Sequence, residues 1–513
     1  MSGTFGLRAR VSRRTRAAID RWRRPRRSEG SEANILAISD LHLGFDLRRG
    51  ASRAGPPHQD APLAALLAHH EAHRAGGRPW RLVIAGDMVD FIGITLTPEP
   101  TEEVPFEVSA TERLGGLWPE PSKAVWKLRR VLERHRLFFA RLAAFVAAGN
   151  ELVVIRGNHD QEWSLPEVQE AFTGALADLA LPRLVQEAAR RARLEAARRA
   201  FLGRIRFHDW FYLEPGRLYV EHGHLHDEFA SVADFGRPPG DAPPRALHES
   251  VSTLALRLFS NRHEGLDMND VERWALLDFV RWAIQSGEPG RILWDYLAMA
   301  GRVLSFSLRT SARTMAKSAG ELVRLSKALA TDDGRLGALR AMLRGVRADH
   351  DALARDLLGL LRPPAEESVL ACAQLLYVDR LLVGMAALAG LASCAAARAT
   401  PHGRAGGLAL VVAAALGLNY LLTRIRRADS HPKLLRAAHR LAVIFGVDFV
   451  VMGHSHRAVD QAVGAGARYF NLGTWLTPSR DENGALSFPH LVITGSRATL
   501  RHWQEEKRQS VVA

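Results

Sequence analysis

Five short motifs in this chain of 513 residues combine carboxylate, imidazole and amide side chains, the groups that bind divalent metal ions in proteins. In chain order the motifs are Asp40-Leu41-His42, Gly86-Asp87-Met88-Val89-Asp90, Gly157-Asn158-His159-Asp160, Glu221-His222-Gly223-His224 and Gly453-His454-Ser455-His456. This mixture of oxygen and nitrogen donors suits two adjacent first-row metals such as manganese, iron or zinc. A single motif of this kind is common in surface loops, but five in succession indicate a dinuclear metal site. The two cysteines of the chain can form neither a disulfide framework nor a cysteine-ligated zinc site.

Each motif stands at the end of a short apolar segment that has the composition of a β-strand. We expect strands at Ile35–Ile38, Leu82–Ala85, Leu152–Ile155, Leu218–Glu221, Phe449–Met452, Tyr469–Leu472 and Leu491–Thr494. Helical stretches are expected near residues 61–75, 121–148 and 167–206. The carboxyl ends of the strands of an α/β sheet converge on one edge, so the motif side chains are expected to meet there. Gly86, Gly157 and Gly453 are expected to give the backbone the freedom that these strand-to-loop turns need.

Changes in composition divide the chain into a basic N-terminal arm, an α/β domain in two parts and a helical insertion between those parts. In this order along the chain, the arm, the first part, the insertion and the last part cover residues 1–30, 31–240, 241–440 and 441–505. A segment rich in proline and glycine, 236–244, marks the start of the insertion, which has the periodicity of amphipathic helices. Within the first part, the acidic segment Pro98–Pro119 is expected to form a mobile loop near the mouth of the site.

Two runs without a charged residue lie inside the insertion: Leu381–Ala397, with 17 residues, and Ala405–Thr423, with 19. A membrane-spanning helix needs about 20 apolar residues, with a lower limit of about 17, so the runs predict a transmembrane hairpin over residues 381–423. Their richness in alanine and glycine leaves a second interpretation open, a hairpin buried in a soluble, cytoplasmic protein. Arginines are more frequent at the outer flanks of the hairpin than in its loop. By the positive-inside rule this places the α/β domain on the cytoplasmic side of the cytoplasmic membrane.

The net charge of +14 is concentrated at the N-terminus. Ten arginines and one acid, Asp20, fall within residues 8–27, so this segment carries 10 − 1 = +9 and the rest of the chain +5. A charge confined to one segment disfavours a nucleic-acid-binding protein, and no nucleic-acid partner is expected. No apolar segment follows the arginines, so the arm is not a secretory signal. It is either a polybasic segment that binds anionic lipid headgroups or a solvated tail.

As an ordered set, the five motifs resemble those of the calcineurin-like metallophosphoesterases, and the resemblance covers about residues 33–235 and 445–503. It implies a four-layer αββα sandwich of two sheets, interrupted here by the long helical insertion with its hairpin. It also implies that one metal ion is bound by Asp40, His42 and His456, that a second is bound by Asn158, His222 and His454, and that Asp87 bridges the two. Manganese is the expected metal, with iron or zinc as alternatives. Two such ions clamp a phosphate and make hydroxide available near neutral pH, so a phosphate ester is the expected substrate.

His159 follows the ligand Asn158 and is the natural group to stabilise the transition state or to protonate the leaving oxygen. Either Asp90 or Asp160 could orient the His159 ring, and the sequence does not choose between them. Both carboxylates are therefore candidate catalytic residues beside His159.

His224 and His226 are further imidazoles close to the fourth motif. The family motif uses only His222, so we expect supporting or structural roles for the other two. Glu221 is either a buried partner of a ligand histidine or a structural carboxylate.

Within the family, Gly453–Arg457 followed by Tyr469–Trp475 is most similar to the UDP-2,3-diacylglucosamine hydrolases, which split a pyrophosphate in a nucleotide-linked lipid at the cytoplasmic face of the membrane. The chain carries His159 where that branch typically carries arginine. Its insertion is also far longer than their helical cap, with 454 − 222 − 1 = 231 residues between His222 and His454. We expect a membrane-anchored, metal-dependent phosphoesterase that acts on a lipid or a nucleotide-linked lipid. The alternatives are a phosphoesterase of a soluble nucleotide or phosphoprotein, and a non-catalytic scaffold.

Overall fold

The fold was analysed in a computed structural model of the chain. The structure describes residues 33–51, 53, 55–187, 191–232, 250–263, 266, 276–328, 353, 356–362, 365, 368–397, 400–425, 429–480, 486–504 and 510–512. The basic arm, residues 1–30, and the segment rich in proline and glycine, 236–244, lie outside the described residues.

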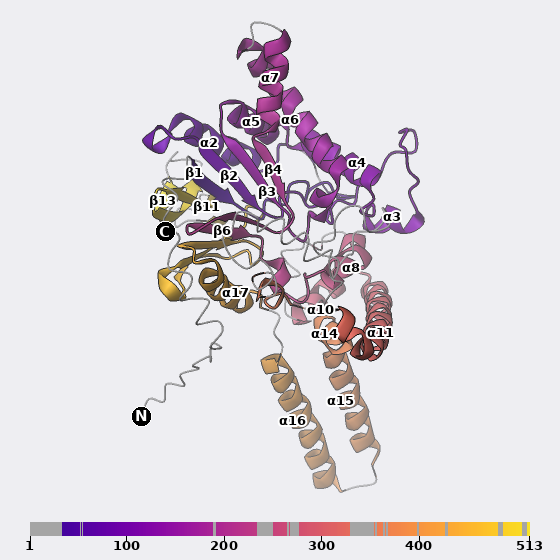
Figure 1. The fold of residues 1–513 in the computed structure, drawn as a ribbon. Coiled ribbons are helices and arrows are strands. Elements are labelled where there is room, and N and C mark those ends of the chain that lie inside the picture. The colour runs from indigo at the N-terminus through magenta and orange to yellow at the C-terminus, as the bar shows by residue number, and fades with distance from the viewer. Residues whose placement is uncertain are drawn as a thin grey trace.

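Strands from both ends of the chain form the first of two sheets (Figure 1), with the order β13-β12-β11-β1-β2-β3-β4 and with β10 paired to β11. The strands are β1 (Asn34–Ile38), β2 (Trp80–Ala85), β3 (Glu151–Ile155), β4 (Ile205–His208), β10 (Ser479–Arg480), β11 (Leu486–Thr494), β12 (Arg497–Gln504) and β13 (Ser510–Val512). The first four strands run parallel, and β11 pairs antiparallel with β1.

The second sheet has the order β5-β6-β7-β9-β8. Its strands are β5 (Phe211–Glu214), β6 (Leu218–Glu221), β7 (Phe449–Met452), β8 (Ala458–Ala462) and β9 (Arg468–Leu472). Its three central strands are parallel, and β6 and β7 are neighbours although the whole insertion separates them in the sequence. The carboxyl ends of strands from both parts of the α/β domain therefore reach one edge.

Alternate residues of the central strands face two different cores. In β1, Ile35 packs between the two sheets, and Leu36 packs against the helices outside the first sheet. Those helices are α2 (Asp60–Ala72), α4 (Pro121–Arg134), α5 (Arg136–Ala147) and α6 (Pro166–Glu187), with α7 (Arg191–Leu202) following α6. In β7, Val451 faces the first sheet, and Val450 packs against α17 (His431–Phe445) outside the second. The mixed α/β fold with two sheets is confirmed, with helices on the outer faces of both.

All seven expected strands are present, and β11 begins five residues earlier than expected, at Leu486 rather than Leu491. The helical stretch 121–148 is two helices, because His135 interrupts it. The Nδ1 atom of His135 lies 2.7 Å from an oxygen of Asp60, and its Nε2 atom accepts a hydrogen bond of 2.9 Å from the Gly44 backbone N–H. The stretch 167–206 is likewise two helices, and its last two residues belong to β4.

The acidic segment Pro98–Pro119, expected to form a mobile loop near the mouth of the site, contains one short helix, and the mobility of the rest stays a prediction. This helix is α3 (Ala110–Gly115), whose first turn has a capping box between Ser109 and Glu112. The carboxylate of Glu112 is buried and accepts a hydrogen bond of 2.7 Å from Lys123 on α4. This ion pair anchors the end of the acidic segment at α4.

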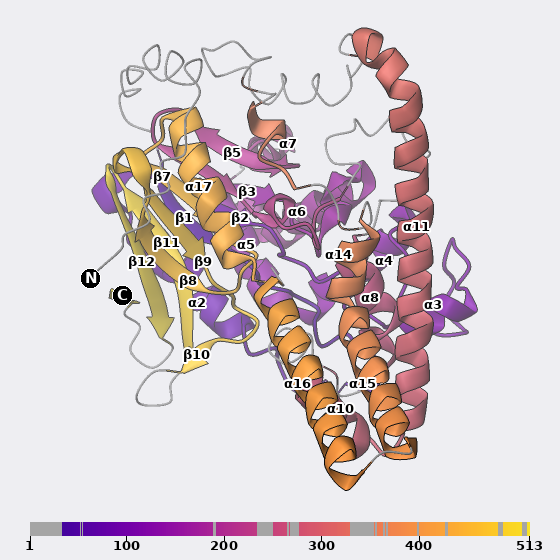
Figure 2. The same cartoon turned by 90° about the horizontal axis from the view of Figure 1, so that it is seen from below.

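The insertion forms its own apolar cluster, and hydrogen bonds from Arg257 and Asn261 join its first helices to the segment around α3. Its described helices are α8 (Val251–Leu258), α10 (Leu276–Gln285), α11 (Pro289–Ala328), α14 (Val369–Leu375), α15 (Val378–Ala396) and α16 (Pro401–Ile425). The view from below shows α15 and α16 running side by side away from the body (Figure 2), and α14 contacts both α11 and α15.

Two helices of the hairpin, over Val378–Ala396 and Pro401–Leu422, are long and apolar enough to cross a membrane. Neither helix has a buried residue in its most apolar window. The described residues therefore do not bury this hairpin as a soluble core would, and its membrane insertion stays a prediction.

Two buried imidazoles between α2 and β11 make the fold sensitive to acid. Burial lowers the pKa of His490 to about 3, and it holds the pKa of His70 well below its ordinary value. Both rings are neutral in the fold, whereas in the unfolded chain they take up protons below about pH 6.5. Their contribution to stability is complete above that pH and is lost as the pH falls toward 3, by up to about 1.4 kcal/mol per pH unit for each ring.

We expect His490→Leu to make the unfolding free energy depend less on pH below pH 6.5, because the variant takes up one proton fewer when it unfolds. The measurement is the unfolding free energy of the purified protein between pH 7 and pH 4, with His402→Leu, at an exposed histidine, as control. An unchanged pH slope in His490→Leu would contradict the prediction.

Candidate metal centre

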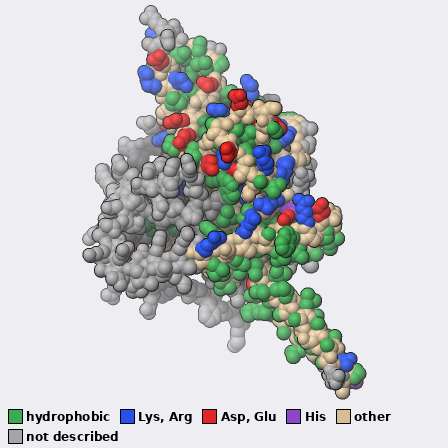
Figure 3. Space-filling model, turned by 90° about the vertical axis from the view of Figure 1, so that its right-hand side faces the viewer, with side chains coloured by type: hydrophobic (Ala, Val, Ile, Leu, Met, Phe, Trp, Pro, Cys, Tyr) green, Lys and Arg blue, Asp and Glu red, His purple; other side chains and the backbone are tan. Residues whose placement is uncertain are grey.

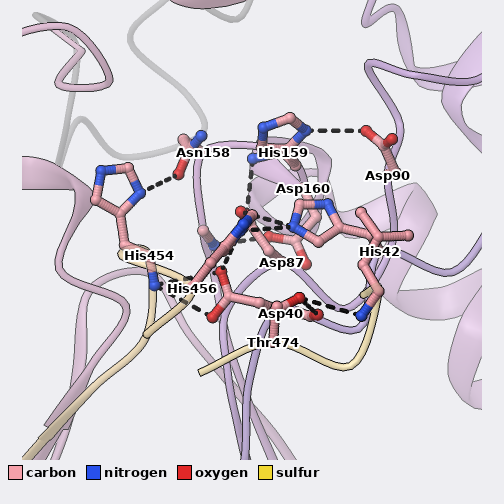
Figure 4. A network of polar contacts seen from close by, with 12 residues as sticks. Asp40, His42, Asp87, Asp90, Asn158, His159, Asp160, His454, His456 and Thr474 are labelled. Carbon is pink, nitrogen blue, oxygen red and sulfur yellow. Dashed lines mark hydrogen bonds and ion pairs between the residues drawn. The ribbon is translucent and has the colours of Figure 1, made fainter. Parts of the chain in front are cut away.

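The side chains predicted to bind metal lie together at the carboxyl ends of five strands, β1, β2, β3, β6 and β7 (Figure 4). Three strands belong to the first sheet and two to the second. The seven residues brought together are Asp40, His42, Asp87, Asn158, His222, His454 and His456. Five are fully or almost fully buried, and His454 and His456 are partly exposed.

Asp40, His42 and His456 form the first group of donors, whose ligand atoms all lie within 4.8 Å of one another. The Nε2 atoms of His42 and His456 are 3.3 Å apart, and the Nε2 atom of His456 is 3.2 Å from a carboxylate oxygen of Asp40. Two imidazole nitrogens and a carboxylate that converge in this way fit a divalent first-row metal ion.

Asn158, His222 and His454 form the second group. The carbonyl oxygen of the Asn158 side chain is 3.0 Å from Nε2 of His222 and 3.1 Å from Nδ1 of His454. The Nδ1–H of His222 donates to the backbone carbonyl of Ala85 at 2.9 Å. This hydrogen bond fixes the tautomer and leaves the Nε2 lone pair of His222 directed into the group.

Asp87 lies between the two groups. One of its carboxylate oxygens is 3.2 Å from Nε2 of His222 and 3.8 Å from Nε2 of His42. Burial opposes ionisation of Asp87, but the neighbouring His222 and His159 hold its pKa well below the ordinary value. An ionised carboxylate at this place can serve both groups, and the oxygen and imidazole donors together fit two divalent ions.

Five of the residues in the metal centre have a left-handed backbone conformation. Among the described residues other than glycine, six have a positive φ, and Tyr377 is the only one of them outside the metal centre. The other five are Asp40, His42, Asp87, His454 and His456. Such conformations are costly for residues with a Cβ atom and collect at functional sites, where the surrounding fold imposes them.

The three motif glycines serve two different needs. Gly86 has a φ of +89°, and a Cβ atom there would lie 2.4 Å from Nδ1 of His222. Gly157 and Gly453 have no positive φ, so the expectation of backbone freedom was wrong for them. They are needed for space, because a Cβ atom would lie 2.1 Å from a carboxylate oxygen of Asp87 at Gly157 and 2.0 Å from the Ser39 hydroxyl at Gly453.

His159 is held by Asp90 rather than by Asp160. Its Nδ1 atom lies 2.9 Å from a carboxylate oxygen of Asp90, and its backbone N–H donates to Asp87 at 2.8 Å. Burial lowers the pKa of His159, but the charges of Asp87 and Asp90 outweigh it and raise that pKa to about 9. One ring nitrogen of His159 is therefore held by Asp90.

Asp160 holds the loops instead of orienting His159. One of its oxygens accepts hydrogen bonds from the Met88 backbone N–H at 2.7 Å and from the Trp163 indole N–H at 2.9 Å. The other accepts from the Gly157 backbone N–H at 2.7 Å. Asp160 thus ties the loop after β2 to the loop after β3, and its geometry does not support the catalytic role considered for it from the sequence.

Glu221 is a structural carboxylate. One oxygen is 2.6 Å from Nε2 of His226, and the other accepts from the indole of Trp210 at 2.6 Å and from the hydroxyl of Tyr219 at 3.0 Å. His224 is buried beside His222, with ring centroids 5.4 Å apart, and belongs to none of the donor groups.

The segment Tyr469–Trp475 supports the centre through backbone contacts. The amide of Asn471 donates to the Gly453 carbonyl at 2.6 Å, and the hydroxyl of Thr474 donates to the Asp40 carbonyl at 3.0 Å. These hydrogen bonds join the first and fifth motifs, which lie at opposite ends of the chain.

Asp227 and Lys433 are two supporting residues that the sequence did not reveal. Asp227 is almost fully buried, and one of its oxygens lies 3.3 Å from Nε2 of His454. Its other oxygen accepts a hydrogen bond of 2.8 Å from Lys433 on α17. A carboxylate behind a ligand histidine fixes which ring nitrogen faces the metal. The position of Asp227 just after the fourth motif was a usable signal, but nothing local pointed to Lys433.

We expect Asp227→Asn to weaken metal binding by about 10–100-fold, because the His454 ring loses its charged partner. The measurement is a manganese titration of metal-depleted protein. Asp460→Asn, which removes an exposed partner of Arg468, is the matched control and should bind as the wild type does. Equal metal affinity in Asp227→Asn and the wild type would show that Asp227 does not support the site.

Comparison with known proteins agrees with the chemistry of this site. Residues 33–256 match the calcineurin-like phosphoesterase family. The matched segment contains the first four motifs, and the fifth lies beyond it. A search of curated proteins finds no match to the chain.

Proposed function

We propose that this chain, which carries a calcineurin-like phosphoesterase domain at residues 33–256, is a hydrolase that cleaves a phosphate ester or pyrophosphate with two divalent metal ions, manganese foremost. The observation that carries the proposal is the place of Asp87 between two groups of metal donors. A shared carboxylate between two groups of three donors is the arrangement that a pair of adjacent metal ions requires.

The contacts of the donor residues indicate which of them would hold each ion. One ion would be held by Asp40, His42 and His456, the other by Asn158, His222 and His454, and both by Asp87. When bound, two such ions polarise a phosphate and lower the pKa of water so that hydroxide is available near neutral pH.

His159 supplies a proton at the leaving oxygen. Asp90 takes its Nδ1–H, so the Nε2–H is the one that can be donated to a substrate oxygen. A side chain positioned for proton transfer accelerates such reactions by about 10²–10⁴-fold. Asp90 fixes the orientation of the ring.

The substrate we propose is a lipid or a nucleotide-linked lipid at the cytoplasmic face of the membrane. Helix α16 ends at Ile425, and Lys433, 433 − 425 = 8 residues later, is bound to Asp227 behind the metal ligand His454. Eight residues span at most about 30 Å, so the metal centre lies near the base of the hairpin. Arg457, next to His456, also pairs at 3.4 Å with Asp429, which lies between the hairpin and α17. A hairpin in the bilayer would therefore keep the site near lipid headgroups.

Activity and location test the two parts of this proposal separately. Detergent-solubilised protein with manganese is expected to hydrolyse an aryl phosphodiester, and a screen of lipid and nucleotide phosphoesters then ranks the substrates. In cell fractionation, the protein is expected to stay in the membrane pellet at high salt and to leave it only with detergent. Release by salt alone would favour a soluble nucleotide or phosphoprotein as substrate, and turnover without added or bound metal would contradict the proposed chemistry.

A further inference from the structure

Helices α10 and α11 expose large apolar side chains next to the hairpin. Trp294 on α11 is 71% exposed, and Leu293 and Leu297 on the same face are exposed as well. On α10, Ile284 is 63% exposed and Val280, one turn earlier, is also exposed. Residues four apart lie on one face of a helix, so each helix presents an apolar stripe. Soluble proteins rarely leave a contiguous apolar surface of this kind uncovered.

The opposite face of α11 is anchored in the insertion, so these side chains cannot simply rotate inward. Ile292, Met299 and Val303 are buried in the apolar cluster of the insertion. Because they recur at helical spacing, they fix which face of α11 points outward.

The exposed face is continuous with the base of the hairpin. The hydroxyl of Tyr296 donates to the backbone carbonyl of Leu376, two residues before α15 begins. Leu370 on α14, which packs between α11 and α15, is 67% exposed. In the space-filling view, hydrophobic side chains continue from the hairpin onto the adjoining helices, and basic side chains border them (Figure 3).

Arginines on the same two helices suit an anionic surface. Arg281 on α10 and Arg302 on α11 are exposed, and Arg291 on α11 is exposed but pairs with Glu288 at 2.9 Å. Long arginine side chains can lay their methylene groups along apolar surface and keep the charge among headgroups. Each such charge near an anionic leaflet adds to the attraction.

We propose that α10 and residues 289–305 of α11 lie in the headgroup region of the bilayer, with Trp294 as the interfacial anchor, and so form a second membrane contact beside the hairpin. This inference rests on the proposed insertion of the hairpin. A hairpin alone leaves the α/β domain free to tilt, whereas a second contact fixes the orientation of the body. The metal centre, which is joined to the hairpin through Lys433 and Asp227, is then held toward the lipid surface.

The depth of single residues in the bilayer tests this proposal. The full chain with Cys394→Ser receives one new cysteine, at Trp294→Cys, Leu388→Cys or Leu137→Cys, and Cys372 stays because it is fully buried. Each variant is labelled with an environment-sensitive fluorophore and reconstituted in phosphatidylcholine–phosphatidylglycerol vesicles with quencher lipids of two depths. Leu388 lies in the middle of α15. Leu137 is an exposed leucine on α5, a helix that covers the first sheet on the side away from the hairpin (Figure 1).

We expect the label at position 294 to be quenched by the shallow quencher, about 5–10 Å into the boundary of headgroups and acyl chains. The label at 388 should be quenched from the deep position, and the label at 137 by neither. Quenching at 388 but not at 294 would overturn this inference and leave the hairpin proposal intact. No quenching at 388 would overturn the hairpin proposal and this inference with it. Burial of 294 without lipid quenching, together with a dimer in detergent, would assign the face to a second copy of the chain and overturn the proposal.

Discussion

Asp87→Asn is expected to lower the hydrolysis of an aryl phosphodiester by at least about 10³-fold, since partners behind single ligands already change activity by about 10–100-fold. Asp87 stands 3.2 Å from Nε2 of His222 and 3.8 Å from Nε2 of His42, so its charge is shared by both donor groups. Replacement by the neutral amide keeps the shape but removes the ionised oxygen from both. The loss should appear in kcat and in metal affinity together.

The matched control is Asp178→Asn, which neutralises an exposed carboxylate on α6. It is expected to keep wild-type turnover and metal content. Thermal unfolding of both metal-free variants checks that the amide at position 87 has not unfolded the domain. Wild-type turnover in a folded Asp87→Asn protein would refute the shared role of this carboxylate.

His159→Gln is expected to reduce kcat by about 10²–10⁴-fold without displacing metal. Asp90 holds Nδ1 of His159 at 2.9 Å, so the ring is positioned to give its other proton to a leaving oxygen. An amide in its place cannot protonate a leaving oxygen. The loss should be larger for an alkyl ester, whose leaving group needs a proton, than for a nitrophenyl ester, whose leaving group does not.

Substitutions of Asp90 and Asp160 are expected to have different effects, because Asp90 acts in catalysis through His159 and Asp160 holds the loops together. Asp90→Asn should reduce kcat in the wild-type background and add little in the His159→Gln background, because Asp90 acts through His159. Asp160→Asn should instead lower the free energy of unfolding by about 1–3 kcal/mol, since both oxygens of Asp160 accept from buried donors and the amide nitrogen that replaces one of them cannot. Loss of metal from His159→Gln in proportion to activity would contradict the assigned role of His159.

The central strands and the site residues could be predicted because the same local pattern encodes both. A short apolar segment followed by glycine, aspartate or histidine predicts both where a strand ends and which polar side chains follow it. The segment Ile35–Ile38, followed by Asp40 and His42, is an example. The parallel pairing of such strands then brings distant motifs to one edge. Short edge strands such as β8, Ala458–Ala462, were not predicted, because polar residues interrupt their apolar pattern.

Features that depend on long-range packing could not be predicted. Lys433 reaches Asp227 across 206 positions in the sequence, and neither residue signals the other locally. The choice of Asp90 over Asp160 needed the actual contacts of both carboxylates. The left-handed φ of His454 and His456 could not be read from residue type, because the surrounding fold imposes it.

The hairpin shows a different limit of sequence reasoning. An apolar helix of about 20 residues is compatible with a membrane or with a soluble core, and composition does not separate the two. The structure adds that the most apolar windows of both helices contain no buried residue. Exposure of this extent favours the bilayer as the environment of α15 and α16.

The metal content of the active protein tests the central claim most directly. Metal-depleted protein is titrated with Mn²⁺, and bound metal per chain and hydrolysis of an aryl phosphodiester are measured at each step. The dinuclear site predicts that two ions bind per chain and that full activity requires both. A saturated protein with a single bound ion and full activity, or hydrolysis that does not depend on metal, would contradict it.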